Sequence, residues 1–572
     1  MFQFARGFLI TAAVIVSVWY FPKKLCSQEL PPVPPRAKME KLAAEIVSRM
    51  SDEVKAGQII HVAIAGKEAD EDALKEIRKI RPGGVILFGM NLGTKEEIRT
   101  LTKDLQAEMK ELKLPPLLIS TDQEGGRVVR VESGVTQFPS AMAVGQTSNS
   151  DYAYKIGFAT AYQLKKLGIN TVFAPDLDIN NNPENPVINT RSFGVTPETV
   201  IRMGIAYEKG ARSAGALPVI KHFPGHGDTN VDSHIGLPVI DKTEEELMQF
   251  ELLPFKKAVE EGARSVMSAH IVFSKIDPDY PATLSPLVLK NILRNRLKFN
   301  GLVFTDAMEM DAISKNYKNV KRGVLAVLAG ADVILMTSFG KNTAEYYDMV
   351  LSAVKKKEFM SGEINLIDEA IKRQLIAKME LGLFSESFSS LNINDEELKT
   401  YLSRRNKSAK EFYEYLKKEN LNDLNRKISS EGIRAWKNEF FPPSAETVKT
   451  FHFHLRQDRL KEEVELLGYD AVSEKRLKKM LSKKIKGVFV LDSRDQADLR
   501  RINSFIKTNP KADYILLHTG SPFLEFPSNP NVKVLFSFSP TDASCAGLVL
   551  RAFNSEESVK PADIVYRKTM LK

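Results

Sequence analysis

Short apolar runs rich in β-branched residues alternate with amphipathic stretches throughout residues 37–385. Buried strands of a parallel sheet have this appearance, and the intervening stretches carry helix start signals such as Thr243 followed by Glu246. Eight strand-helix alternations in one segment predict an α/β fold of the (β/α)8 TIM-barrel type. The eight candidate strands are 58–65, 84–88, 117–121, 171–175, 218–221, 265–268, 302–305 and 332–336.

The N-terminus has a different pattern, in which Arg6 precedes a largely apolar run over residues 8–21. A run of this length suits a secretory signal peptide and is short for a bilayer-spanning helix. We expect residues 1–27 to be a signal peptide or, alternatively, an uncleaved N-terminal anchor, and the proline-rich residues 28–36 to be a spacer. The protein would then be exported to the periplasm or cell envelope, and an uncleaved segment would anchor it to the inner membrane.

After residue 385 the pattern changes again. A charged, helical linker is predicted over residues 386–440, and a smaller α/β domain over residues 441–572. The candidate strands of that domain are 448–454, 487–491, 514–518 and 532–538, with helices between them such as 496–506.

Composition narrows the class of protein. Among 572 residues, 43% are hydrophobic and 27% are charged, which is close to the globular average and excludes disorder, fibres and multi-span membrane proteins. Two cysteines, Cys26 and Cys545, cannot supply a disulfide framework or a cysteine-rich zinc site. Most of the net charge of +9 lies in residues 386–572. Any membrane or cell-wall association would involve this part or the N-terminus, although a solvated basic face explains the same residues, and no nucleic-acid partner is expected.

Polar and ionisable side chains follow the C-terminal ends of five candidate strands. A (β/α)8 barrel places its active site at these ends. Helix capping would explain one or two such residues but not five sets at once. The residues are Asp122 and Glu124, Asp176 and Asp178, Lys221 and His222, His270, and Asp306.

The segment 221–234 holds three of the eight histidines in the chain. Imidazole and carboxylate groups suit zinc, so His222, His226 and His234 form one candidate ligand set. Proline and glycine between the first two histidines break any helix that would place them on one face. We therefore expect no metal and no other cofactor.

A second interpretation concerns proton transfer. Residues 225–237 predict a glycine-containing loop over the barrel mouth that presents Asp232 and His234 as a pair. The carboxylate would hold one ring nitrogen and leave the other to exchange a proton. Asp306 would place a second carboxylate in the mouth, unless it caps the next helix. A retaining glycosidase requires at least a carboxylate nucleophile and a separate proton donor.

The chain resembles glycoside hydrolase family 3, in its β-N-acetylglucosaminidase (β-N-acetylhexosaminidase) branch, over about residues 45–385. The resemblance rests on consecutive motifs, of which the fourth is highly specific. They are D-Q-E-G-G-R-V at 122–128, D-I-N-N-N-P-E-N-P-V at 178–187, R-S-F-G at 191–194, K-H-F-P-G-H-G-D-T-N-V-D-S-H at 221–234 and F-T-D at 304–306.

This resemblance implies a retaining exo-β-N-acetylglucosaminidase that removes terminal non-reducing N-acetylglucosamine from β-glycosides such as peptidoglycan fragments. Asp306 would be the nucleophile, and His234, oriented by Asp232, the acid/base. Further residues would hold the hydroxyls and the acetamido group of the sugar, although Arg130 could equally be an exposed helix charge. These residues are Asp122, Arg130, Arg191, Lys221 and His222.

Three alternatives remain. A β-N-acetylglucosaminide phosphorylase could use the same barrel, because a histidine acid/base carries no fixed negative charge that repels phosphate. A β-glucosidase would need the same hydroxyl-binding residues. A catalytically silent cell-wall-binding protein would not need both Asp306 and the Asp232/His234 pair. The C-terminal domain resembles a shortened form of the three-layer second domain of longer family members, and we expect it to be a packing or docking module.

Overall fold

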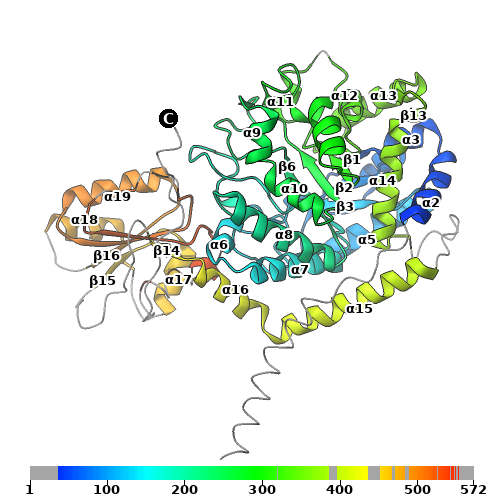
Figure 1. Ribbon diagram of the computed structural model, residues 1–572. Coiled ribbons are helices and arrows are strands. Elements are labelled where there is room, and N and C mark those ends of the chain that lie inside the picture. The colour runs from blue at the N-terminus through cyan, green and yellow to red at the C-terminus, as the bar shows by residue number, and fades with distance from the viewer. Residues whose placement is uncertain are drawn as a thin grey trace, which may run out of the picture.

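The computed structural model describes residues 36–384 except Asn319, residues 396–435, 451–466, 471–483 and 488–522, and most of 524–552 (Figure 1). The predicted signal peptide or anchor and almost all of the proline-rich spacer lie outside the described residues. No helix within the described ranges is long and apolar enough to cross a membrane.

The larger part of the molecule is a closed barrel of parallel strands, which confirms the predicted fold. Six strands are paired in the order β11-β1-β2-β3-β4-β5, and three more in the order β10-β8-β6. Parallel bridges from Phe304 to Val333 and from Asp176 to Lys221 join the two sheets at both edges. The barrel strands are β1 (Ile60–Ala63), β2 (Gly84–Ile86), β3 (Leu118–Thr121), β4 (Thr171–Val172), β5 (Leu217–Pro218) with β6 (Ile220–Phe223), β8 (Ser265–Ser268), β10 (Leu302–Phe304) and β11 (Ile334–Leu335).

Helices follow the barrel strands and cover their outer side (Figure 1). The helix start signals predicted from the sequence are present in the structure. Thr243 and Glu246 form a capping box, and Thr196 caps a helix that begins with Pro197. The helices up to the sixth strand are α2 (Arg36–Ser48), α3 (Asp52–Gln58), α4 (Glu71–Ile80), α5 (Lys95–Glu111), α6 (Ala141–Gln146), α7 (Ser150–Lys166), α8 (Pro197–Ser213), α9 (Glu244–Gln249) and α10 (Leu253–Glu260). The π-helix η4 (Leu287–Arg296), α11 (Asp311–Ser314), α12 (Arg322–Ala329), α13 (Lys341–Lys355) and α14 (Leu366–Leu381) complete the ring.

Several short strands and 3-10 turns lie outside the barrel strands and the main helices. Two strands, β7 (Val239–Ile240) and β9 (Val272–Phe273), pair in parallel, and β12 (Met360–Ser361) forms a hairpin with β13 (Ile364–Asn365). Single turns of 3-10 helix are η1 (Gly89–Asn91), η2 (Asn189–Arg191) and η3 (Ala282–Leu284).

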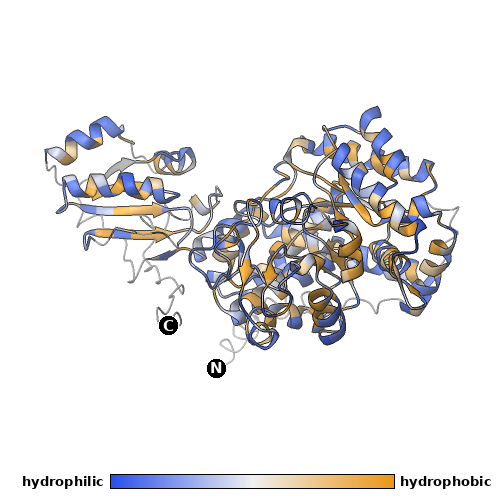
Figure 2. Ribbon diagram, turned by 90° about the horizontal axis from the view of Figure 1, so that it is seen from above, coloured by the Kyte–Doolittle hydropathy of each residue, from blue (hydrophilic) through white to orange (hydrophobic). Residues whose placement is uncertain are grey.

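The core has two layers because successive side chains of a strand point to opposite faces. In β1, Ile60 and Val62 pack outward against the helices, whereas Ala63 belongs to an inner cluster with Phe173 and Phe304. The inner cluster fills the barrel axis, and Figure 2 shows the barrel strands coloured largely as hydrophobic.

Two helices lead from the barrel to the smaller unit. Helix α15 (Glu396–Lys418) buries one face against α7, where Phe412 contacts Tyr154 and Phe158 edge to face. Helix α16 (Leu421–Glu431) follows it. The predicted linker is therefore packed on the barrel.

In its described residues, the smaller unit has a five-stranded sheet in the order β14-β18-β17-β16-β15. All four predicted strands are present, and the antiparallel edge strand β14 was not predicted. Alternate residues of the sheet join two clusters: Phe489 and Leu491 pack beneath α18 and α19, whereas Val488 and Val490 pack against α17. The unit is thus a three-layer α/β domain. Its elements are β14 (Arg434–Ala435), β15 (Phe451–His454), α17 (Asp458–Leu466), α18 (Glu474–Ser482), β16 (Val488–Ser493), α19 (Gln496–Thr508), β17 (Asp513–His518) and β18 (Val532–Phe536).

Contact between the two parts centres on helix α6. Met142 and Ala143 of this helix belong to the hydrophobic cluster of the smaller unit. The Ser140 hydroxyl, just before the helix, donates to the carbonyl oxygen of Phe538 at 2.7 Å. Helix α6 therefore connects the C-terminal unit to the loop after β3.

Candidate active site

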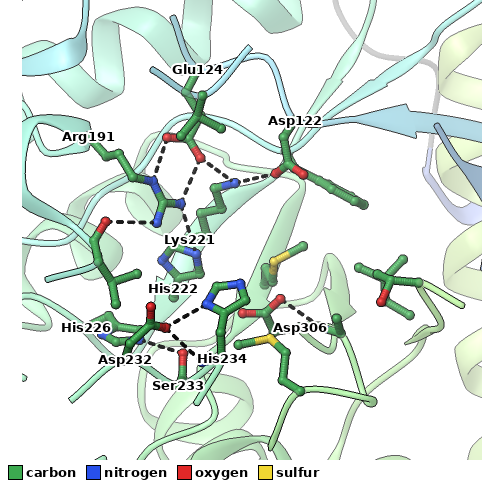
Figure 3. A pocket seen from close by; sticks show the side chains of 18 of the residues that line it. Asp122, Glu124, Arg191, Lys221, His222, His226, Asp232, Ser233, His234 and Asp306 are labelled. Carbon is green, nitrogen blue, oxygen red and sulfur yellow. Dashed lines mark hydrogen bonds and ion pairs between the residues drawn. The ribbon is translucent and has the colours of Figure 1, made fainter. Parts of the chain in front are cut away.

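A cavity of about 390 Å³ opens at the C-terminal ends of the barrel strands. All eight residues predicted from the sequence line it, although they come from segments far apart in the chain. Figure 3 labels all of them except Arg130. They are Asp122, Arg130, Arg191, Lys221, His222, Asp232, His234 and Asp306.

One wall of the cavity is a charged cluster around Glu124. This carboxylate accepts two hydrogen bonds from the Arg191 guanidinium, at 2.9 and 2.8 Å, and lies 2.7 Å from Lys221 Nζ. The Lys221 ammonium also donates to Asp122 at 2.8 Å. Burial alone would raise the pKa of Glu124, but Arg191 and Lys221 hold it well below its usual range. Glu124 therefore fixes the two cations, while Asp122 stays partly open to the cavity.

His222 is held from both ring nitrogens. Its Nδ1 lies 2.7 Å from Asp178, and its Nε2 lies 3.4 Å from the Arg191 guanidinium. Because arginine only donates, Nε2 accepts and the proton is on Nδ1. Burial, together with Arg191, lowers the pKa of His222 to about 4. His222 is thus a neutral, fixed side chain at the cavity wall.

Ligand atoms of Asp176, Asp178 and His222 lie within 4.8 Å of one another, which makes this trio a candidate metal site. Asp178 already accepts the backbone N–H groups of His222 and His226, at 3.2 and 2.7 Å, and the His222 proton points at it. The Arg191 guanidinium lies 3.8 Å from Asp176. These contacts occupy the Asp178 carboxylate with three hydrogen-bond donors and place the Arg191 cation beside Asp176. They favour the interpretation without metal.

Asp306 follows β10 at the base of the cavity. One of its carboxylate oxygens accepts the Ala307 N–H at 2.7 Å. Burial alone would raise the pKa of Asp306, but the surrounding imidazoles, led by His270, and the hydrogen bond from the Ala307 N–H lower it below its ordinary value. The next helix, α11, has Met310 as its N-cap. The interpretation of Asp306 as a helix cap is therefore wrong, and its carboxylate is available to a ligand.

Asp232 and His234 form a pair on the loop over the cavity. One oxygen of Asp232 accepts from His234 Nδ1 and from the His234 backbone N–H, each at 2.8 Å. The Nδ1 proton is therefore committed to Asp232, and Nε2 is left to give or take a proton. Figure 3 shows the His234 ring between Asp232 and Asp306. The geometry can place a proton donor beside a carboxylate nucleophile.

Arg130 lines the cavity from the loop after β3, where its backbone N–H donates to Gln123. It does not lie on a helix, so the alternative of an exposed helix charge is wrong. The neighbouring Arg127 also lines the cavity and donates to the carbonyl oxygen of Val187 at 2.8 Å.

The sequence analysis placed Glu124 and Asp178 at strand ends and considered His226 as a metal ligand, but it gave them no role in catalysis or sugar binding, and it did not single out Arg127. Arg127 and Glu124 lie in the first quoted motif, Asp178 begins the second, and His226 lies within the fourth. The motifs were therefore a sufficient signal for their presence in the site. Their roles depend on contacts between distant segments, which the sequence does not show.

Comparison with known proteins agrees with this geometry. The model of the glycosyl hydrolase family 3 N-terminal domain matches residues 51–375. The chain is 39% identical over 280 residues to β-hexosaminidase A of Pseudoalteromonas piscicida, covering 46% of this chain and 47% of that protein. It therefore spans about half the length of that relative. It is 31% identical over 320 residues to the β-hexosaminidase of Haemophilus influenzae, covering 55% of this chain and 89% of that protein.

Among solved structures, the chain is similar to a glycoside hydrolase family 3 β-N-acetylglucosaminidase from Paenibacillus sp. str. FPU-7. The TM-score is 0.75 at 30% sequence identity, and the match covers 90% of this chain and 98% of that one. The similarity thus includes both the barrel and the smaller unit.

Proposed function

Because the chain belongs to glycoside hydrolase family 3, we propose that it is a retaining exo-β-N-acetylglucosaminidase acting on terminal, non-reducing N-acetylglucosamine. The observation that carries the proposal is the cavity shared by Asp306 and the Asp232/His234 pair. Its charged wall of Asp122, Lys221 and Arg191 offers the donors and acceptors that a ring of sugar hydroxyls requires.

The first step forms a covalent glycosyl-enzyme. Asp306 attacks the anomeric carbon while the glycosidic bond breaks, and His234 gives its Nε2 proton to the departing oxygen. Asp232 holds the opposite ring nitrogen and stabilises the protonated ring before transfer. The lowered pKa of Asp306 keeps this carboxylate ionised and nucleophilic.

The second step releases the sugar. His234, now neutral, takes a proton from water, and the resulting hydroxide attacks the anomeric carbon and displaces Asp306. Two displacements at one carbon retain the β configuration. The same histidine therefore serves as acid and then as base, without a metal or other cofactor.

The choice of N-acetylglucosamine is supported by the names of the relatives, and peptidoglycan fragments are the substrate class we propose. Turnover of an aryl N-acetylglucosaminide beside the matching aryl glucoside tests this choice. A site that binds the 2-acetamido group is expected to prefer the first substrate at least about a hundredfold in kcat/KM. Comparable values for the two would refute the assignment.

A phosphorylase is the rival activity, because an exposed histidine acid/base carries no fixed negative charge that repels phosphate. The same assay with and without phosphate separates the two reactions. The proposed hydrolase releases free sugar at a phosphate-independent rate. Phosphate-dependent turnover with release of a sugar 1-phosphate would establish the rival.

We also propose that the protein is exported and associates with an anionic envelope surface through its smaller unit. The solvent-facing side of α18 carries Lys475, Arg476 and Lys479, and Arg500 and Lys507 are exposed on the adjacent α19. Co-sedimentation with isolated cell walls and with anionic vesicles is expected to weaken when these five residues are changed to glutamine.

N-terminal sequencing of the mature protein tests removal of residues 1–27.

A further inference from the structure

Ser233 differs from its neighbours in the loop over the cavity. It is only 2% exposed, whereas the side chains of Asp232 and His234 on either side are 30% and 63% exposed. Its hydroxyl lies 3.0 Å from His226 Nε2, and its carbonyl oxygen accepts the Ala312 N–H at 3.4 Å. Ser233 is thus the anchored residue between the two members of the exposed pair.

The direction of the Ser233 hydrogen bond follows from the contacts of His226. The Thr229 hydroxyl donates to the His226 carbonyl oxygen at 3.1 Å, so its oxygen accepts from His226 Nδ1 at 2.9 Å. Nε2 of the neutral ring is then an acceptor, and the Ser233 hydroxyl is its donor. Burial lowers the pKa of His226 to about 3, which keeps the ring neutral in this arrangement.

His226 is itself held rigidly. Its N–H donates to Asp178 at 2.7 Å, and its carbonyl oxygen accepts the Asn185 side-chain N–H at 2.8 Å. Asp178 also binds His222 in the cavity wall. Contacts therefore run from the sugar-binding wall through His226 to Ser233, while Ala312 links Ser233 to the segment after Asp306.

We propose that Ser233, anchored by His226, is a positioning residue that sets the location of the Asp232/His234 pair above Asp306. Ser233 does not touch the reacting atoms. Its hydrogen bond fixes the backbone on which both members of the pair are carried, so its loss leaves the pair intact but displaced from the glycosidic oxygen. The inference rests on the proposed function, because it concerns the proton transfer in that reaction.

Ser233→Ala tests this role with aryl N-acetylglucosaminides of graded leaving-group ability. A poor leaving group needs the proton from His234, whereas an activated one does not. We expect kcat/KM to fall about tenfold to a hundredfold for the poorest leaving group, and less than about threefold for the most activated one, since small displacements of a catalytic group have effects of this size. Inhibition by free N-acetylglucosamine is expected to be unchanged.

Three further variants are compared with Ser233→Ala. His234→Ala is expected to show the same dependence on leaving group with a larger loss. Ser274→Ala removes an exposed hydroxyl that donates to Asp241, outside the cavity, and is expected to match the wild type. Ser233→Cys keeps the size of the side chain and a weak donor, so its loss is expected to be smaller than that of Ser233→Ala.

Equal losses on all substrates, or no loss on any, in both Ser233 variants would overturn the positioning role. If Ser233→Ala does not fold, Ser233→Cys decides by the same criterion. A wild-type protein that turns over none of these substrates would refute the proposed function itself, which distinguishes the two failures.

Discussion

Glu124 shows how one buried carboxylate organises the charged wall. Its side chain is 4% exposed and serves both Arg191 and Lys221. Glu124→Gln would keep the shape and leave two buried cations with one carboxylate fewer. Removing one partner of a buried ion pair costs about 3–5 kcal/mol, so we expect a lower melting temperature together with weaker sugar binding.

A surface ion pair provides the control for this prediction. Glu71 contacts Arg78 and its side chain is 77% exposed. Glu71→Gln is expected to change the free energy of unfolding by less than about 1 kcal/mol. Calorimetry on both variants decides the point: equal melting temperatures would show that Glu124 does not hold the cluster.

For single residues, the sequence predicted contacts between side chains that are close together in the chain. It did not predict contacts between side chains that are far apart in the chain. Asp232 and His234 are two residues apart, so their pairing followed from spacing and chemistry. Glu124 and Arg191 meet only because β3 ends beside the loop after β4, and no local pattern encodes that contact. For the same reason His226 was considered as a metal ligand, although it is the neutral anchor of Ser233.

Among the elements, the last barrel helix carries an unusual buried residue. Lys378 of α14 is fully buried, and its ammonium has Gln58 as hydrogen-bond partner at 3.4 Å. Burial lowers the pKa of Lys378 to about 7. An unfolded chain therefore binds more protons between about pH 7 and the ordinary lysine range, and the free energy of unfolding rises with pH across that window.

Lys378→Met removes the free-energy cost of burying an ammonium group and keeps the length of the side chain. We expect its melting temperature to exceed that of the wild type by at least about 2 °C at pH 7, with a gain that shrinks toward pH 10. Lys341→Met on the exposed face of α13 is the control and is expected to show no such trend. A gain that stays constant with pH would contradict the lowered pKa of the buried Lys378.

The elements themselves were largely predictable. All eight barrel strands and four of the five strands of the smaller unit were found, because buried parallel strands leave continuous apolar runs. Strand β14 has two residues at a sheet edge, too short for a pattern. The packing of α15 on α7 was also missed, since its charged exposed face dominates its composition.

For the whole molecule, the question is what the smaller unit contributes. The loop after β3 supplies Asp122, Glu124 and Arg130, and it leads into α6, which packs into the smaller unit. Met142→Asp would place a charge in this apolar contact. We expect separation of the units, seen as faster limited proteolysis of residues 396–435, and a raised KM with a smaller change in kcat.

Met360→Asp is the matched control, because Met360 lies exposed on the β12 hairpin. It is expected to leave both proteolysis and KM unchanged. A separated Met142→Asp protein with the wild-type KM would show that the smaller unit does not support the sugar-binding loop.

Covalent labelling of Asp306 tests the central claim most directly. A slow, fluorinated N-acetylglucosaminide is expected to increase the mass of the intact protein by one sugar, and peptide mapping should place this label on Asp306. Asp306→Ala is expected to take up no label and to lose several orders of magnitude in turnover. A label on Asp122 or Asp178, or turnover without any covalent intermediate, would contradict the account.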